Sequence, residues 1–432
     1  MRIRSVKKPA PGCSERAVPA EQTLERARRS AAAAVTRLAD ITGLDRLGIP
    51  VYAAVVPKSD DPISVYNGKG VRRIDAQTGA WMEAIERQTA LRAELAVVKG
   101  SLRQLRRGRR AVADPATFNR RLRENYGRDR PYLWTEAWDL IANEPVLAPA
   151  GAAGFGRKYG NTSSPFWVSS SNGLASGNCL EEAICHALCE LVERDAFTLA
   201  ELRSQWIPRA RREAALGAQA AAEGWDDPDV CPRIDLSAAG DPFPELLAGF
   251  ARAGLFPVVR DITSDLGVPS AAACLAEDVL PGFPQAHGGM GAHPNARVAI
   301  ARALTELAQS RVVDIQGARE DILPAGESAG IALRHTKRVG KLEPRRWIFQ
   351  QDGRVRRFAE IESFESDDIA EDIRLILARL VRRGIERVLV VDLSEPGGFA
   401  VARVIVPGLE SWALDREKIG PRAAEFWRRH VG

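Results

Sequence analysis

The stretch 171–194 carries the densest group of side chains in this chain that could do chemistry. Four polar residues follow one another there at steps of four, four and three: Glu182, His186, Glu190 and Glu193. An α-helix has 3.6 residues per turn, so this spacing places all four on one face, with apolar residues on the opposite arc. Carboxylates stacked on one face repel each other, and Mg²⁺, which prefers oxygen ligands, would relieve that repulsion. The pattern predicts a metal-binding face, with a solvated acidic surface as the alternative.

The residues just before this helix form a small-residue stretch, Ser-Asn-Gly-Leu-Ala-Ser-Gly-Asn, at positions 171–178. Its two glycines would let a ligand approach the backbone closely. Asn178 is predicted to be the N-cap of the helix, and acidic residues fill the first turn. Free N–H groups and the positive end of the helix dipole converge at such a terminus. We therefore expect an anion to bind beside the acidic face.

Two further predicted helices carry polar residues at helical spacing. The helix predicted for 75–100 holds Glu83 and Glu86, three residues apart, with Arg87 beside them. The helix predicted for 295–316 holds a second set at steps of four and three: Arg302, Glu306 and Gln309. Taken alone, the second set is better explained by an intrahelical Arg–Glu ion pair worth about a few tenths of a kcal/mol.

Together the three helices offer carboxylates for Mg²⁺, cations for phosphates and a loop with free N–H groups. A nucleoside triphosphate bound through metal ions requires this combination. The sequence contains no Walker A motif, no Rossmann glycine motif after a strand and no HExxH zinc motif. A P-loop nucleotide site is therefore not expected.

Several of these motifs resemble the YcaO family, whose members use ATP to activate backbone amide oxygens in peptides. The resemblance rests on 171–178, on Glu-Glu-Ala-Ile at 181–184 and on Glu-Leu-Val-Glu-Arg at 190–194. Residues 68–70 with 82–87 resemble the N-terminal nucleotide and metal element of the family, and 302–311 resemble its third element. The similarity extends from about Thr42 to Glu410 and implies a YcaO-like fold around an ATP and Mg²⁺ site.

The resemblance also implies which residues bind the two cofactors, ATP and Mg²⁺. The implied Mg²⁺ ligands are Glu83, Glu86, Glu190 and Glu193. The implied nucleotide contacts are Lys69, Ser171, Asn178, Glu182, Arg194, Arg302, Glu306 and Gln309. No catalytic side chain is assigned, because the peptide oxygen itself attacks the γ-phosphate and the protein positions the reactants and neutralises charge.

Within the family, three segments resemble the TfuA-associated branch, which is linked to thioamide formation: 42–51, 186–190 and 406–410. The chain end, 426–432, lacks the proline-rich terminus typical of azoline-forming members, which counts against a cyclodehydratase. That enzyme stays as the alternative. The implied partners are a precursor peptide, a TfuA-like protein and an external source of sulfide, since no cysteine lies in a recognisable sulfur-carrier motif. A homodimer is compatible with the sequence.

Composition indicates which kinds of partner and which cell compartment to expect. The 432 residues carry 61 Lys and Arg against 56 Asp and Glu, a net charge of +5, so we expect no nucleic-acid partner. Six cysteines without a CxxC pair indicate a reducing cytoplasm. No segment has the length of a membrane span, and we expect no membrane partner. Cys179 is the one cysteine that a helix dipole could activate.

The stretch 91–125 is basic and is predicted to be rich in helix, with Lys99 followed by a group of arginines: Arg103, Arg106, Arg107, Arg109 and Arg110. It is interpreted either as the solvated face of a helical hairpin, which we favour, or as a docking surface for an acidic peptide or nucleic acid. The docking interpretation also allows a function of another class, a non-catalytic peptide-binding scaffold.

The remaining pattern predicts an α+β protein with mixed sheets. Helices are expected at 21–39, 75–100, 179–194, 243–253, 295–316 and 367–383, and strands at 49–56, 132–140, 256–262, 271–275, 387–393 and 400–406. Turns are expected at 67–70 and 288–291, and a loose arm at 1–20. The expected domains are an N-terminal arm and helix at 1–41, a catalytic domain at 42–410 with a basic helical insertion at about 91–125, and a tail at 411–432.

Overall fold

The computed structural model describes residues 1–9, 15–30, 33–118, 120–156, 158–159, 171–216, 226–280, 283–317, 347–411 and 419–431. Its longer α-helices are α1 (Ala20–Arg28), α2 (Arg73–Arg92), α6 (Leu180–Glu201), α7 (Ile207–Leu216), α8 (Phe243–Arg252), α9 (Ala296–Gly317), α11 (Ile369–Arg382) and α12 (Pro421–Val431). Shorter ones are α3 (Leu102–Arg107), α4 (Arg120–Asn125) and α5 (Ala150–Ala153). None of the helices in these ranges is long and apolar enough to cross a membrane.

The described strands form three sheets. The first contains β1 (Arg37–Asp40), β2 (Val51–Val55) and β3 (Val65–Lys69), in that order. The second has the order β11 (Phe283–Ala292), β10 (Ser270–Leu280), β9 (Val258–Asp261), β8 (Arg233–Asp235) and β12 (Val355–Arg357). The third has the order β4 (Val97–Gly100), β5 (Tyr132–Asp139), β13 (Leu389–Asp392), β14 (Ala400–Ile405) and β7 (Leu174–Gly177), and β6 (Glu144–Pro149) pairs with β5. Strands β8 and β12 run parallel and the other pairs antiparallel, which confirms the predicted α+β class with mixed sheets.

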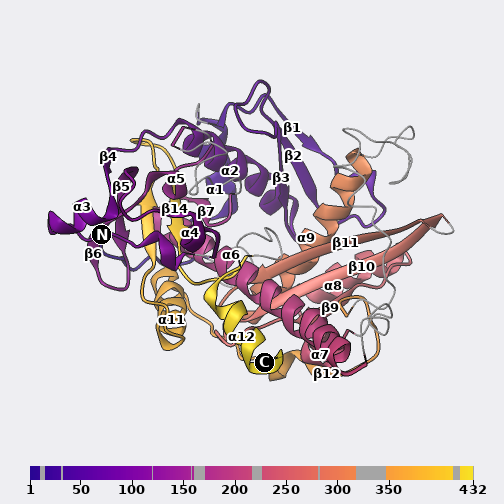
Figure 1. Ribbon diagram of the computed structural model, residues 1–432. Helices are drawn as coiled ribbons and strands as arrows, with labels where there is room; N and C mark the ends of the chain where they lie inside the picture. The colour runs from indigo at the N-terminus through magenta and orange to yellow at the C-terminus, as the bar shows by residue number, and fades with distance from the viewer. Residues whose placement is uncertain are drawn as a thin grey trace.

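Helix α6 lies near the centre of the molecule, between the second and the third sheets (Figure 1). It contacts β7 and β14 of the third sheet, β10 and β11 of the second, and α11. Its apolar arc packs into one core with strands β13 and β14 and helix α11 through buried residues that include Ile184, Leu188 and Val192. The apolar packing that the sequence predicts for this helix is therefore confirmed, and it fixes the direction in which the polar face points.

Two glycine-rich segments that we predicted as turns are strands. Residues 67–69 belong to β3 and 288–291 to β11. A Cβ on Gly68 would lie 2.0 Å from the carbonyl oxygen of Ala76 in α2, and one on Gly291 would lie 2.0 Å from the carbonyl oxygen of Ala299 in α9. These glycines therefore allow a helix to pack closely on a strand rather than allowing the chain to turn.

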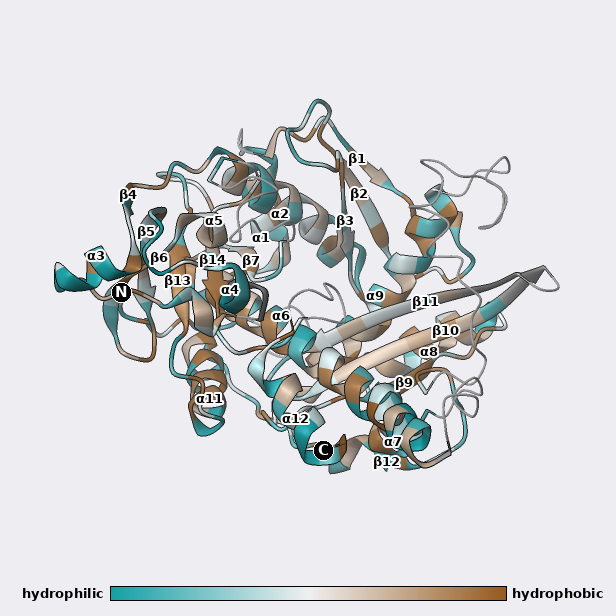
Figure 2. Cartoon of the chain, viewed as in Figure 1, coloured by the Kyte–Doolittle hydropathy of each residue, from teal (hydrophilic) through white to brown (hydrophobic). Residues whose placement is uncertain are grey.

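Several helix boundaries differ from the prediction. The helix expected at 21–39 ends at Arg28 in α1, and residues 37–40 form the strand β1 instead. The helix expected at 75–100 ends at Arg92, and the β-branched residues Val97 and Val98 continue as β4. The basic stretch is consequently a strand followed by the short helices α3 and α4, not a helical hairpin. Figure 2 shows α3 as largely hydrophilic.

Asn178 is not the N-cap of the central helix. The N-cap position belongs to Cys179, which makes no capping hydrogen bond through its side chain. The amide of Asn178 is turned instead to Glu182, donating to its Oε2 over 3.0 Å, and to Thr23 of α1. A tertiary partner on another helix has thus replaced the local capping bond.

The N-terminal residues are not a loose arm over the part of 1–20 that the structure describes. Lys7 pairs with Asp368 in an isolated β-bridge, and the backbone and guanidinium of Arg4 both donate to Glu181 at the start of α6. Residues 10–14, including Cys13, lie outside the described residues. The tail prediction falls partly on 412–418, also outside them, and beyond those residues α12 is helical.

Candidate functional site

One cavity of about 650 Å³ lies along the polar face of α6, between α2, β3 and α9. Four carboxylates from two helices line it: Glu83 and Glu86 from α2, and Glu190 and Glu193 from α6. The helical spacing predicted each pair separately. Only the packing of α2 against β3 and β7 brings the two pairs to the same cavity.

Backbone amides hold three of these carboxylates in place. Oε2 of Glu83 accepts the N–H of Asn67 in β3 over 3.1 Å, and Oε2 of Glu86 accepts the N–H of Ser176 in β7 over 3.1 Å. Oε2 of Glu190 accepts the N–H of Gly173 over 3.0 Å. Each of these carboxylates is thereby oriented by a backbone N–H, and among the described residues its second oxygen accepts no backbone hydrogen bond.

The electrostatics of the cluster favour the binding of cations. Burial raises the pKa of Glu83 and of Glu193 to about 7, and it raises the pKa of Glu190 above its ordinary value. Burial and the neighbouring carboxylates Glu83 and Glu190 raise the pKa of Glu86 further. Ionisation of these carboxylates costs free energy in the protein alone, and it becomes favourable once a divalent cation lies between them. The donor set, carboxylate oxygens only, fits Mg²⁺.

Two protein cations border the carboxylate cluster. Nζ of Lys69 lies 2.5 Å from Oε2 of Glu306, and Nη2 of Arg194 lies 3.6 Å from Glu190 and 3.5 Å from Glu193. Burial alone would raise the pKa of Glu306, but Lys69 and Arg194 outweigh it and hold that pKa below its ordinary value. This end of the cavity therefore combines fixed positive charge with carboxylates, as triphosphate and Mg²⁺ together require.

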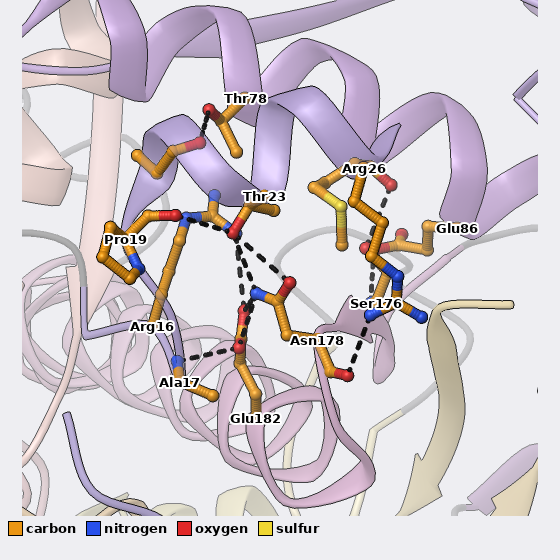
Figure 3. A network of polar contacts seen from close by, with 12 residues as sticks. Arg16, Ala17, Pro19, Thr23, Arg26, Thr78, Glu86, Ser176, Asn178 and Glu182 are labelled. Atoms are coloured by element: carbon orange, nitrogen blue, oxygen red, sulfur yellow. Dashed lines mark hydrogen bonds and ion pairs between the residues drawn. The ribbon is translucent and has the colours of Figure 1, made fainter. Parts of the chain in front are cut away.

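The other end of the cavity lies toward the start of α6. Glu182 and His186 line it, together with Arg302 of α9. The side chain of His186 is exposed to the cavity, and desolvation by the surrounding protein, with help from the guanidinium groups of Arg302 and Arg16, lowers its pKa to about 3. Glu182 is 7% exposed and accepts hydrogen bonds from Asn178 and from the N-terminal segment (Figure 3).

The structure brings together nearly all the residues that the sequence singled out. Those that line the cavity are Lys69, Glu83, Glu86, Ser171, Glu182, Glu190, Glu193, Arg194, Arg302, Glu306 and Gln309. Asn178 does not line it but contacts Glu182, which does. The roles of these residues toward ATP and Mg²⁺ stay predictions.

One buried cation behind the carboxylates was not predicted from the sequence. Arg403 in β14 is 1% exposed, and its Nη1 donates to the carbonyl oxygen of Asn172 over 2.7 Å. Burial lowers its pKa to about 10, while Glu190 and Glu86 act in the opposite direction. A single arginine within an otherwise apolar strand was the available signal, because a charge is buried only when it has a counter-charge.

The cysteine environments differ from the expectation. Burial raises the pKa of Cys179 to about 11, against the lowering that the helix dipole suggested. On α6, Cys189 accepts a hydrogen bond from Cys185 and lies beside Arg302, and these two contacts hold its pKa below its ordinary value. Helix position alone does not determine whether these thiols ionise.

The lining of the cavity, carboxylates beside Lys69 and Arg194, is typical of a nucleotide and metal site built on helix faces, and the sequence contains neither a P-loop nor a Rossmann motif. The sequence model of a family described as YcaO cyclodehydratase, ATP- and Mg²⁺-binding, matches residues 67–410. The chain belongs to the YcaO family, whose members are ATP-dependent enzymes that act on peptides. The prediction of ATP and Mg²⁺ as cofactors is confirmed at the level of the family.

Two relatives are similar over most of their length. An uncharacterized protein of Methanothermobacter thermautotrophicus is 33% identical over 405 residues, which cover 90% of this chain and 93% of the relative. A protein of Rhizobium leguminosarum bv. trifolii, described as an uncharacterized protein in the tfuA 3′ region, is 33% identical over 383 residues, covering 87% and 84%.

Two solved structures share the fold. YcaO from Methanopyrus kandleri, bound with AMPPCP and Mg²⁺, has a TM-score of 0.70 at 23% identity, covering 97% of this chain and 98% of that one. A heterocyclase in complex with substrate and cofactor has a TM-score of 0.74 at 22% identity, covering 95% of this chain. This chain spans 54% of that heterocyclase. At these identities the likeness shows the YcaO-like fold, which confirms the prediction.

Proposed function

We propose that this protein uses ATP to phosphorylate a backbone amide oxygen of a ribosomally made peptide and that sulfide then replaces the oxygen, leaving a thioamide. The observation that carries the proposal is the cavity in which four carboxylates from α2 and α6 face Lys69 and Arg194. Glu83, Glu86, Glu190 and Glu193 would hold Mg²⁺, which supplies positive charge to the phosphates.

Bonds and charges balance without a side-chain nucleophile. The amide oxygen forms a bond to the γ-phosphorus as the bond to ADP breaks. Hydrosulfide adds to the former carbonyl carbon, inorganic phosphate leaves with the oxygen, and loss of a proton gives the C=S bond. Lys69 and Arg194 neutralise charge on the transferring phosphoryl group, and the backbone-held carboxylates keep the reactants aligned.

The thioamide outcome is supported by the relative named for its position beside tfuA, 33% identical across 87% of this chain. We propose accordingly that a TfuA-like protein assists and that sulfide comes from outside the chain. The raised pKa of Cys179, caused by burial, argues against this residue as the sulfur carrier, because a sulfur carrier needs a reactive thiolate.

We also propose that the catalytic unit is 42–410, with 1–41 as an accessory arm and helix and 411–432 as a tail. The enzyme would work in the cytoplasm. The contacts of the N-terminal residues with α6 support an arm that serves the site rather than an independent domain.

The alternative on the same fold is an azoline-forming cyclodehydratase, which the family description and the solved heterocyclase favour. Incubating the protein with ATP, Mg²⁺, sulfide, partner and precursor peptide separates the two by mass. Replacing oxygen by sulfur adds about 16 Da, whereas loss of water removes about 18 Da, both after the same amide phosphorylation. A loss of water would overturn the thioamide assignment, and an unmodified peptide with no ATP consumption would overturn both enzymes.

A further inference from the structure

Strand β4 leaves one side of its backbone open to an added strand. It pairs antiparallel with β5, from Val97 opposite Thr135 to Gly100 opposite Tyr132, and no strand in the described ranges pairs with its other side. A strand paired on one side directs every second N–H and C=O group away from its neighbour. Figure 1 shows β4 on the side of the molecule where α3 lies. We call this unpaired side of residues 97–100 the β4 edge.

Apolar side chains are exposed along the β4 edge. Val97 is 41% exposed and Val98 is 37% exposed, so a β-branched side chain reaches solvent on each face of the strand. Leu133 of β5 lies opposite Lys99 and is 38% exposed. Residues opposite each other share a face, so Leu133 lies on the same face as Val97. Exposed apolar groups beside an unpaired backbone favour pairing with another strand.

The cations around the β4 edge are not neutralised within the described chain. Lys99 on β4, Arg107 at the end of α3 and Arg109 just after it are exposed, and none of them makes an ion pair with a described residue. Leu102 of α3 shares a core cluster with Trp134 of β5, which keeps α3 beside the edge. Carboxylates would pair with these cations, whereas a second copy of this chain would bring the same cations and be repelled.

We propose that the β4 edge binds an extended acidic segment of the peptide substrate as an added strand; this deepens the proposed function and rests on its peptide substrate. Main-chain hydrogen bonds supply the affinity, and alternate side chains of the segment meet Val97 and Leu133 on one face. An unfolded segment brings free N–H and C=O groups, whereas a folded partner would have to expose an edge of its own. Residues 97–100 do not line the cavity, so docking and chemistry use separate surfaces.

The test uses the full chain without ATP, Mg²⁺ or sulfide, and a labelled synthetic peptide of alternating glutamate and valine as the probe. Fluorescence anisotropy measures the affinity, and hydrogen exchange read by mass spectrometry measures the protection of amides 97–100. The probe should bind and slow exchange in 97–100, because an added strand bonds the outward N–H groups. A matched peptide with lysine in place of glutamate should not bind.

One variant tests the charge of the β4 edge. Lys99→Glu should weaken binding of the probe about tenfold at low salt, because repulsion replaces attraction. Lys58→Glu is the matched control, since it makes the same charge change at an exposed position between β2 and β3, and it should bind as the wild type does. Glu190→Gln should also bind normally, because Glu190 lies in the cavity.

The outcomes separate this inference from the proposed function. Absence of binding, binding without slower exchange at 97–100, or equal affinity in Lys99→Glu and the wild type would overturn docking on β4. Protection of 97–100 in the free chain that disappears on dilution to a monomer would assign the edge to a second copy, and would overturn it too. If docking passes these tests while ATP, Mg²⁺, sulfide and partner never modify a precursor peptide, the proposed function alone is wrong. If the peptide is modified but does not dock on 97–100, only the role of β4 is wrong.

Discussion

Replacing Glu83 by glutamine should stabilise the unliganded protein while abolishing its binding of Mg²⁺ and ATP. Burial raises the pKa of Glu83 from 4.5 to about 7, which means that its charged form is disfavoured in the folded state. The folded protein therefore retains a proton that the unfolded chain releases between pH 4.5 and about 7, and stability falls as the pH rises through this window. Glutamine keeps the oxygen that accepts the N–H of Asn67 but carries no charge.

The size of the effect follows from the displaced pKa. A change from 4.5 to about 7 corresponds to about 3 kcal/mol, at about 1.4 kcal/mol per pH unit. Because Glu83 faces the cavity, water screens part of this cost, and we expect a gain of about 2 kcal/mol at pH 8. The gain should shrink toward zero below pH 4.5, where the carboxyl becomes protonated in the unfolded chain as well as in the folded protein.

The assay is urea denaturation in EDTA across pH 5 to 8, paired with calorimetric titration of ATP and Mg²⁺. Glu136→Gln is the matched control, since Glu136 is exposed on β5 and lies outside the cavity. The reasoning would be refuted by a Glu83→Gln variant that is less stable than the wild type at pH 8, or by one that still binds ATP with Mg²⁺.

Three further outcomes are expected. Lys69→Met should weaken binding of ATP with Mg²⁺ by more than about tenfold, and it should raise the pKa of Glu306 because the pairing cation is lost. Both changes are measured by titration calorimetry at several pH values, and an unchanged affinity would contradict the prediction. Cys179→Ala, and then replacement of all six cysteines, should preserve thioamide formation from free sulfide, read by peptide mass; loss in Cys179→Ala with ATP binding intact would show that the chain carries sulfur. Charge reversal of four arginines in the basic stretch should weaken binding of the peptide or partner, most strongly at low salt: Arg106, Arg107, Arg109 and Arg110. If the affinity does not depend on salt before or after the change, the stretch is a solvated surface and not a docking site.

The sequence by itself determined the polar face of the central helix and the carboxylate pair of α2. The spacing of Glu182, His186, Glu190 and Glu193 is sufficient to predict that they share one face of the helix. Helical periodicity is a local property, and it places residues three and four apart on the same face. The apolar arc of the same helix determined that this face would point away from the core. The family motifs then indicated that the separate helices share one site.

Only the tertiary structure decided what surrounds that site. The strands β3 and β11 look like turns in sequence, since the effect of a glycine depends on the helix that packs against it. The N–H donors of Asn67, Gly173 and Ser176 come from backbone, which no residue type reveals. Arg16 reaches the cavity, and Arg403 reaches the carboxylate cluster, from remote parts of the chain. Such long-range contacts form because buried charges require counter-charges, not because of any local pattern.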